Sequence, residues 1–372
     1  MNNISNLKEK VLIVIPIINS YKIFKDSFYT KNNLENRKSE TISLVRALNV
    51  NVLDVLTIKI NKFSSAYLFN KNSLDCILEL IKKLKINLLI IDFQLSPIQQ
   101  RNLELFFKVK VIDRTQVILE IFSSRAISNE GKIQVELAAL NFQKTRLVRS
   151  WTHLERQRGG SGFLGGPGER QIELDRRIIN KNIKNLSANL QKVVKTRSIQ
   201  NSKRKNSSSI IASLVGYTNT GKSTLFNNLT NSSVISKNML FATLDPTLRL
   251  MKHEMSYKNK IILSDTVGFI SSLPTELVES FKSTLEFIRE SDFLLIVNDA
   301  SDKNMEDKND IILKTLKSIG IEDNYLKENV INVFNKCDLV CNEKQNLYFP
   351  NFKNFIFTSS FNIDDIKKLK KK

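Results

Sequence analysis

The sequence contains few of the residues that mark secreted, disulfide-bonded or metal-binding proteins. Among 372 residues there are 3 cysteines and 2 histidines, and their spacing matches no disulfide framework or metal-ligand pattern. No run of 18 or more apolar residues occurs, which argues against a membrane-spanning helix. The first residues also lack the cleavage site of a signal peptide. We therefore expect a protein of the reducing cytoplasm without stable membrane insertion.

Glycine is also scarce, and its positions are informative. Of 11 glycines, six lie between Gly159 and Gly168, and three more are Gly216, Gly221 and Gly268. In a chain that uses so little glycine, such clusters indicate backbone that needs left-handed or closely packed geometry. These positions are therefore candidates for functional loops.

Acidic residues are outnumbered by basic ones. The chain has 37 Asp and Glu against 57 Lys and Arg, a net charge of +20. Residues 144–205 hold most of the excess, with 16 basic and 4 acidic residues. A local basic surplus of this kind favours a nucleic-acid partner, although a general bias toward lysine would give the same total.

Three regions follow one another along the chain. Residues 1–128 alternate strand-like and helix-like segments, which predicts a parallel α/β subdomain without catalytic motifs. Residues 129–199 carry two apolar stripes with a period near 3.5, which predict an antiparallel helical hairpin with the glycine-rich segment at its tip. A polar linker, residues 200–209, precedes a third region, residues 210–372. In the first region the predicted strands are residues 11–15, 51–60, 87–93 and 109–112, and the predicted helices are residues 41–48, 74–84, 114–122 and one that begins at Ser96-Pro97.

The hairpin tip has two interpretations. Arg156, Arg158 and Arg170 flank its glycines, and Phe163 and Leu164 lie among them. Arginine beside an exposed aromatic side chain suits RNA, because phosphates pair with guanidinium groups and unpaired bases stack on rings. A flexible hinge with solvated charges is the alternative.

The third region begins with a phosphate-binding pattern, G-x-x-x-x-G-K-S, between an apolar strand and a helix. Glycines let backbone amides turn toward phosphate oxygens, and the helix N-terminus attracts the same anion. Lys222 reaches the β- and γ-phosphates, and the hydroxyl of Ser223 binds Mg²⁺. The sequence therefore predicts a P-loop whose phosphate-binding residues are Gly216, Tyr217, Thr218, Asn219, Thr220, Gly221, Lys222 and Ser223.

An acid follows the next apolar strand, in Asp265-Thr266-Val267-Gly268. At a strand end beside a P-loop, such an acid holds Mg²⁺ through water, and the glycine amide contacts the γ-phosphate. Thr243 lies between the two motifs and would add a hydroxyl to Mg²⁺ while the γ-phosphate is present. The candidate catalytic residues are Lys222, Thr243 and Gly268, and the candidate Mg²⁺ ligands are Ser223 and Thr243.

The motif Asn335-Lys336-Cys337-Asp338 indicates which base is bound. Guanine presents N1–H and N2–H₂ side by side, and the carboxylate of Asp338 accepts from both. Lys336 covers the base, Asn335 reaches back to the P-loop, and a backbone amide of Thr358-Ser359-Ser360 meets guanine O6. The order of these elements predicts a Mg²⁺-dependent GTPase that forms GDP and phosphate, rather than an ATPase or a metabolic kinase.

With these motifs the chain resembles the HflX-type GTPases of the Obg–HflX group of translation factors. Inside the third region the resemblance rests on G-Y-T-N-T-G-K-S-T-L-F-N (216–227), F-A-T-L-D-P-T (241–247) and D-T-V-G-F-I (265–270). Outside it rests on V-I-D-R-T (111–115), G-K-I-Q-V-E-L-A (131–138) and G-G-P-G-E-R-Q-I-E-L-D-R-R (165–177), of which the last is absent from other GTPases.

The resemblance implies an α/β fold: a parallel N-terminal subdomain and an antiparallel helical hairpin, followed by a P-loop GTPase domain. It also implies roles for named residues. The first switch would be Phe241, Ala242, Thr243, Leu244 and Asp245, the second switch would begin with Asp265, Thr266, Val267 and Gly268, and the guanine would be held by Asn335, Lys336, Cys337, Asp338, Ser359, Ser360 and Phe361.

The implied partner is the large ribosomal subunit, with the hairpin tip near its ribosomal RNA, and we expect a monomer. The implied role is rescue of stalled ribosomes by splitting their subunits. Large-subunit assembly with GTP as a timer is the alternative. The guanine loop, residues 359–363, lacks the family's usual glycines, and Tyr67-Leu68-Phe69-Asn70-Lys71 replaces a glycine-rich segment of the N-terminal subdomain. The sequence ends soon after the guanine loop, so we expect no counterpart of the C-terminal domain of some members.

Overall fold

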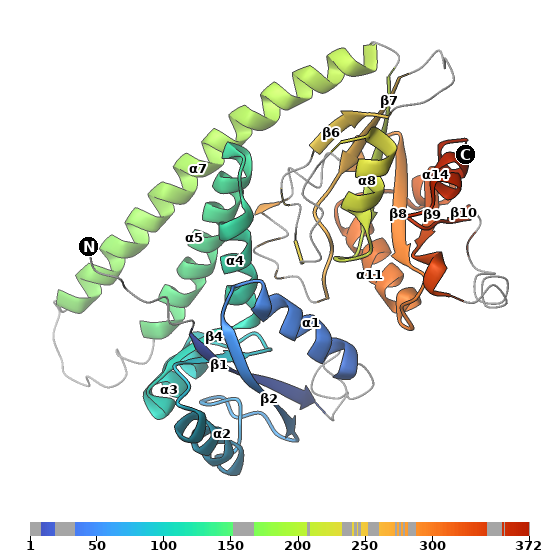
Figure 1. Cartoon of the computed structure of the whole chain (residues 1–372). Coiled ribbons are helices and arrows are strands. Elements are labelled where there is room, and N and C mark those ends of the chain that lie inside the picture. The colour runs from blue at the N-terminus through green and yellow to red at the C-terminus, as the bar shows by residue number, and fades with distance from the viewer. Residues whose placement is uncertain are drawn as a thin grey trace, which may run out of the picture. The chain divides into compact units, whose positions relative to one another are not determined.

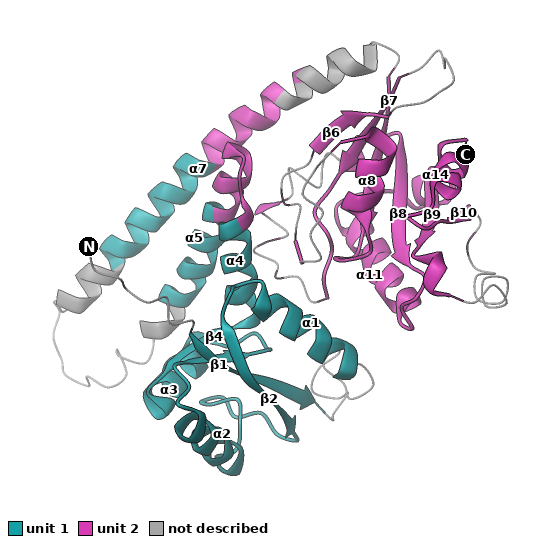
Figure 2. Ribbon diagram, in the orientation of Figure 1, with its two compact units in different colours: residues 1–124, 136–186 teal, residues 125–135, 187–372 magenta. Residues whose placement is uncertain are grey.

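The computed structural model describes two compact units, residues 1–124 with 136–186 and residues 125–135 with 187–372 (Figure 2). Each unit is built on a sheet of its own (Figure 1). The described residues are 9–18, 34–151, 167–206, 209–232, 240–241, 244, 247–251, 260–271, 274, 277, 280–281, 288–340, 352 and 354–371.

The first sheet has four parallel strands in the order β2-β1-β3-β4. Strand and helix alternate along the chain as predicted, and β1 and β3 are almost wholly buried, as expected for a parallel sheet covered by helices. The strands are β1 (Lys10–Ile18), β2 (Asn51–Ile60), β3 (Leu88–Ile91) and β4 (Lys110–Asp113), and the helices are α1 (Leu34–Arg46), α2 (Lys71–Leu84), α3 (Pro97–Phe107) and α4 (Arg114–Arg125).

The start of α3 confirms the predicted cap. The hydroxyl of Ser96 accepts from the amide of Gln99 at 3.2 Å, while the Gln99 side chain accepts from the amide of Ser96 at 3.0 Å. Pro97 is the first helical residue, where its fixed φ is favourable and its missing N–H costs nothing. By contrast, α1 begins at Leu34, ahead of the predicted start at residue 41.

A buried ion cluster lies at the carboxyl end of β3. Asp92 accepts from Nε of Arg37 at 2.6 Å and from a terminal nitrogen of Arg114 at 2.8 Å, and Arg114 also pairs with Glu40. Burial alone would raise the pKa of Asp92, but the charges of Arg114 and Arg37 outweigh it and leave that pKa below its usual value. The cluster therefore joins α1 and α4 to the sheet.

Two long helices occupy the region predicted as a hairpin, α5 (Asn129–Trp151) and α7 (Pro167–Asn206). The tip, with Arg156, Arg158, Phe163 and Leu164, lies outside the described residues. The predicted linker is corrected in part, because α7 continues through residues 200–206. This stretch contains no glycine or proline, and its lysines, arginine and glutamine are good helix formers. In the described part of the chain, no helix is both long and apolar enough to cross a membrane.

The second sheet has six strands in the order β10-β9-β8-β5-β7-β6, with β6 antiparallel to β7 and the other pairs parallel. One apolar cluster holds α8 and α14 on one face, and another holds α11 and α12 on the opposite face. The strands are β5 (Ser209–Gly216), β6 (Thr247–Leu250), β7 (Lys260–Asp265), β8 (Phe293–Asp299), β9 (Val330–Asn335) and β10 (Phe355–Phe357). The helices are α8 (Lys222–Thr230), α11 (Met305–Ser318), α12 (Asp323–Glu328) and α14 (Ile363–Lys371), with a 3₁₀ turn η3 (Cys337–Leu339).

Candidate nucleotide-binding site

Four neighbouring parallel strands of the second sheet end at one edge. Their last residues are Gly216 of β5, Asp265 of β7, Asp299 of β8 and Asn335 of β9. Ligands of open α/β sheets bind outside the carboxyl ends of the strands. The sequence motifs therefore converge on the edge where a ligand is expected.

The P-loop runs from β5 to α8, and two of its glycines are required by close contacts. A Cβ atom at Gly216 would lie 2.4 Å from the carbonyl oxygen of Val297, and one at Gly221 would lie 2.2 Å from Nδ2 of Asn335. Gly221 also has a φ of +90°, which other residues rarely adopt. The loop thus turns sharply into the N-terminus of α8, and helix N-termini attract anions.

The P-loop lysine is buried beneath its own loop. Its Nζ donates to the carbonyl oxygen of Tyr217 at 2.6 Å. Burial lowers the pKa of Lys222 to about 8, and the nearby Asp265 carboxylate offsets part of that effect. A bound phosphate would supply a further negative charge at this point and restore the protonated form.

Ser223 and Asp265 are direct partners. The Ser223 hydroxyl donates to Oδ2 of Asp265 at 2.7 Å, between the first turn of α8 and the end of β7. Hydroxyl and carboxylate oxygens are the ligands that Mg²⁺ prefers, with water and phosphate completing its shell. These two residues therefore fit a Mg²⁺ ion. Thr243, the other candidate ligand, lies outside the described residues, as do Ala242 and Asp245.

The segment after Asp265 is paired to the P-loop by backbone hydrogen bonds. Tyr217 and Phe269 form a parallel β-bridge. In it the amide of Thr218 donates to the carbonyl of Phe269 at 2.8 Å, and the amide of Phe269 donates to the carbonyl of Gly216 at 3.0 Å. Gly268 lies so close that a Cβ there would be 2.8 Å from Cγ2 of Thr218 and 3.1 Å from Nζ of Lys222. The structure thus brings together Lys222 and Gly268, two of the three catalytic candidates.

Other residues of the two switch motifs are held in the fold. Phe241 and Leu244 are buried, and Val267 is half-buried. The hydroxyl of Thr266 donates to the carbonyl oxygen of Leu214 at 2.7 Å. Thr266 therefore faces β5, which anchors the beginning of the predicted second switch to the sheet.

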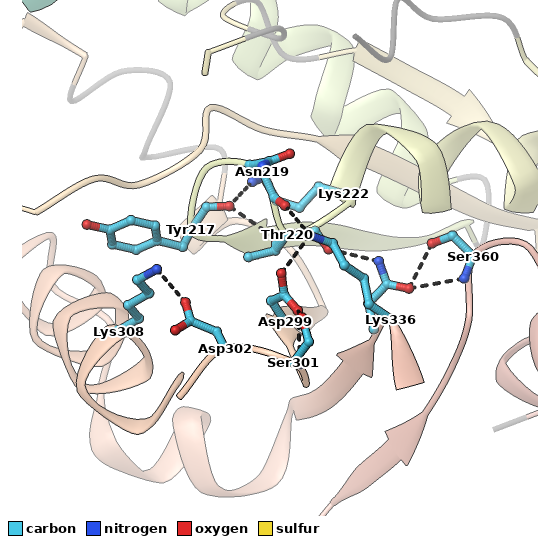
Figure 3. Close-up of polar contacts among 11 residues, drawn as sticks. Tyr217, Asn219, Thr220, Lys222, Asp299, Ser301, Asp302, Lys308, Lys336 and Ser360 are labelled. Carbon is cyan, nitrogen blue, oxygen red and sulfur yellow. Dashed lines mark hydrogen bonds and ion pairs between the residues drawn. The ribbon is translucent and has the colours of Figure 1, made fainter. Parts of the chain in front are cut away.

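Asn335 joins three loops at the base-binding end of the site. Its Nδ2 donates to the carbonyl oxygen of Thr220 at 2.8 Å, as predicted for a link to the P-loop. Its Oδ1 accepts from the amide and hydroxyl of Ser360, at 3.1 and 2.8 Å. Figure 3 shows this junction between the P-loop, the end of β9 and the loop after β10.

The remaining candidates for guanine surround that junction. Asp338 is exposed in η3, Cys337 is half-buried, and Phe361 is 86% exposed. The amide of Ser359 donates to Oδ2 of Asp365 at 3.1 Å, which fixes the guanine loop against α14. The loop is thus held by side chains although it lacks the family's glycines.

Sequence reasoning missed one charged residue at this edge. Asp299 ends an apolar strand, the same signal that singled out Asp265, and its Oδ2 lies 2.6 Å from Nζ of Lys336. The supporting roles of Asn228, which donates to the carbonyl of Ser360, and of Asp365 depend on tertiary contacts that leave no sequence pattern.

Comparison with known proteins covers most of the chain. Three family models match in series: "GTP-binding GTPase N-terminal" over residues 35–123, "GTP-binding GTPase Middle Region" over residues 125–204, and "50S ribosome-binding GTPase" over residues 211–336. GTPase HflX of Magnetococcus marinus is 43% identical over 309 residues, which are 83% of this chain and 70% of that protein. The chain belongs to the HflX family of GTPases.

Other members and a solved structure extend this likeness. GTPase HflX of Escherichia coli is 42% identical over 78% of this chain and 68% of that protein. The crystal structure of the SsGBP–GDP complex covers 97% of this chain and 98% of its own, with a TM-score of 0.50 at 24% identity. That similarity supports the fold: an α/β N-terminal region followed by a P-loop GTPase domain. This HflX chain therefore has the fold class that its motifs predicted, with a GTPase domain after the N-terminal region.

Proposed function

We propose that this HflX GTPase uses Mg²⁺ and GTP to act on the large ribosomal subunit, splitting stalled ribosomes as a monomer in the cytoplasm. The observation that carries the nucleotide part is the Asn335 junction, which ties the P-loop to the guanine loop. The ribosomal part is supported by the family description "50S ribosome-binding GTPase" for residues 211–336 and by the basic surplus of residues 144–205.

In this proposal the chain's own groups bind and orient the nucleotide. The P-loop amides and Lys222 hold the phosphates, while Asp338 selects guanine and Lys336 covers the base. The predicted amide contact to guanine O6 is left out, because the amides of Ser359 and Ser360 donate to Asp365 and Asn335. Mg²⁺ supplies charge neutralisation on the phosphate oxygens when it is bound. Ser223 and Asp265, together with Thr243, are the proposed residues that hold it directly or through water. Gly268 lies beside Lys222, and its amide is the proposed contact to the γ-phosphate.

The rival function is large-subunit assembly with GTP as a timer. Both functions need a switch and an RNA-facing arm, so they differ only in their outcome on intact ribosomes. The test is sedimentation of intact ribosomes after incubation with the protein and either GTP or a non-hydrolysable analogue. Release of free subunits supports splitting, whereas co-sedimentation with intact ribosomes and no release supports the rival.

The hairpin tip is the proposed RNA contact. Shortening residues 159–168 should leave GTP affinity intact and abolish splitting, because the nucleotide site is built from residues of the second sheet. Both properties would be measured on the same shortened protein, and the affinity of the intact protein for subunits should fall as salt rises. Splitting at the wild-type rate by the shortened protein would favour the hinge interpretation of the tip.

A further inference from the structure

Lys336 is tethered at two points that lie on different segments. Its Nζ donates to Oδ2 of Asp299 at 2.6 Å and to the carbonyl oxygen of Asn219 at 2.9 Å. Asp299 is the last residue of β8, and Asn219 lies in the middle of the P-loop. Figure 3 shows the lysine side chain extending between these two partners.

Asp299 is itself held in place. Its Oδ1 accepts from the amide of Ser301 at 3.0 Å and from the Ser301 hydroxyl at 2.6 Å, which leaves Oδ2 directed at Lys336. The neighbouring amide of Ala300 donates to the carbonyl oxygen of Asn335 at 2.9 Å and fixes the end of β8 to the end of β9. The carboxylate is therefore preorganised by its own loop.

The two residues joined by the Lys336–Asn219 hydrogen bond have unusual backbone conformations. Lys336 and Asn219 both adopt left-handed backbone, with φ values of 62° and 64°. Such conformations are costly for residues other than glycine and persist only where surrounding contacts stabilise them. The hydrogen bond between the Lys336 ammonium and the Asn219 carbonyl links the two strained positions, and Asp299 fixes the ammonium that makes it.

We propose that Asp299 is a positioning residue for guanine nucleotides, holding the Lys336 side chain extended over the base site and against the P-loop before the nucleotide arrives. This inference rests on the proposed guanine-nucleotide site. A lysine side chain loses much rotational freedom when it is fixed, and preorganisation removes that cost from the binding step. Asp299 would thereby raise affinity for GTP and GDP without contacting either.

The decisive variant is Asp299→Asn. Its amide oxygen can still accept from Ser301, but its NH₂ group cannot accept from Lys336 or balance its charge. We expect affinity for both GTP and GDP to fall about tenfold, chiefly through faster dissociation, while the preference for GTP over ATP is retained because Asp338 is intact. The matched control is Asp307→Asn, which removes an exposed acid from the first turn of α11 and should leave affinity unchanged.

A double-mutant cycle separates positioning from general damage. In a Lys336→Ala background, Asp299→Asn should cause little further loss, because the side chain through which it acts is gone. An equal loss in both backgrounds, or unchanged affinity of the single variant, would overturn the proposal. Thermal unfolding of each nucleotide-free variant shows whether the fold is intact. If the wild type does not prefer GTP to ATP, the proposed function itself fails, and this inference fails with it.

Discussion

The hydroxyl of Ser223 donates directly to Oδ2 of Asp265, at 2.7 Å. The first residue comes from the P-loop helix and the second from the end of β7, so two motifs about 40 residues apart share one hydrogen bond. Both oxygens are ligands suited to Mg²⁺. The two oxygens therefore lie close enough together for one ion to be held by both, directly or through water.

Ser223→Ala tests this arrangement. The variant loses the hydroxyl but no charge, so GTP affinity in the presence of EDTA should stay close to that of the wild type. On addition of Mg²⁺ the wild type should gain affinity for GTP. The gain of the variant should be smaller by about tenfold, the effect of one good contact to a charged group. Titration calorimetry with and without Mg²⁺ measures both. An equal Mg²⁺-dependent gain in the two proteins would remove Ser223 from the ion's ligands.

The depressed pKa of Lys222 predicts a pH dependence of binding. Burial lowers that pKa to about 8 in the free protein, whereas a bound phosphate favours the charged amine. GTP affinity should therefore be flat below about pH 8 and fall by about tenfold per pH unit above it. Calorimetry at pH 8.5 in two buffers of different ionisation enthalpy should detect uptake of a proton. Binding without proton uptake at that pH would contradict the assignment.

The Lys222 amine also makes the free energy of unfolding depend on pH, with a sign opposite to its effect on GTP affinity. Its pKa in the folded, nucleotide-free protein is about 8, below its ordinary value of 10.5, so between these values the unfolded chain binds more protons than the folded one. This group's contribution to the free energy of unfolding therefore rises with pH across that window. Lys222→Met should lose this contribution while also losing phosphate binding.

Asp338→Ala should remove guanine selectivity. In the proposed site the carboxylate of Asp338 accepts both guanine donors, and loss of one partner of such a charged pair costs on the order of 2–5 kcal/mol. GTP binding should weaken accordingly, while ATP binding, which does not use this pair, should change little. Calorimetry with both nucleotides on both proteins provides the comparison. Equal affinity of the wild type for GTP and ATP would end the guanine assignment.

Intrinsic hydrolysis should be slow because of Phe269. This residue follows Gly268, is 3% exposed, and packs in an apolar cluster with Tyr217 and Ile288. A buried aromatic ring cannot orient water, so we expect a turnover on the order of 10⁻³ s⁻¹ or below without a partner. Phosphate release would be measured with and without large ribosomal subunits. Rapid turnover that is indifferent to the subunits would mean that another group orients the water.

The buried cluster around Asp92 should stabilise the N-terminal unit rather than the nucleotide site. Asp92→Ala leaves Arg37 and Arg114 buried without their shared carboxylate, which should lower the free energy of unfolding by about 3–5 kcal/mol. GTP affinity should be unchanged. Denaturant unfolding followed in the N-terminal unit measures the loss, and Glu35→Gln, which breaks a pair with Lys38 at the surface, should cost about 1 kcal/mol or less.

Local patterns in the sequence predicted much of this structure. Apolar runs located β1, β2, β3, β4, β5 and β7, and the Ser96-Pro97 pair located the start of α3, because burial and capping act over a few residues. The strand that carries Asp299 was overlooked although its apolar run was present. β6 was also missed, since its four residues are all at least partly exposed and take their pairing from β7.

The contacts that complete the site depend on residues far apart in the chain. Sequence spacing identified Lys336, but its partner Asp299 is 37 residues away on the neighbouring strand. The hydrogen bond from Asn228 to the guanine loop spans 132 residues. Such pairs are set by strand order, and the order β9-β8-β5-β7 places β8 between β9, which ends at Asn335, and β5, which leads into the P-loop.

The register of the Tyr217–Phe269 bridge is shifted by one residue relative to the adjoining β5–β7 ladder. Leu214 pairs with Asp265 at the end of the β5–β7 ladder, and Tyr217 pairs with Phe269. The chain therefore advances three residues from Leu214 to Tyr217 but four residues from Asp265 to Phe269 between the same two pairings. The surplus residue makes the Thr266–Gly268 segment bulge out of the ladder, between the hydrogen bond of Thr266 to Leu214 and the bridge at Phe269. A side chain at Gly268 would meet the P-loop, with its Cβ 2.8 Å from Cγ2 of Thr218, so substitution there would push the bulge and the P-loop apart.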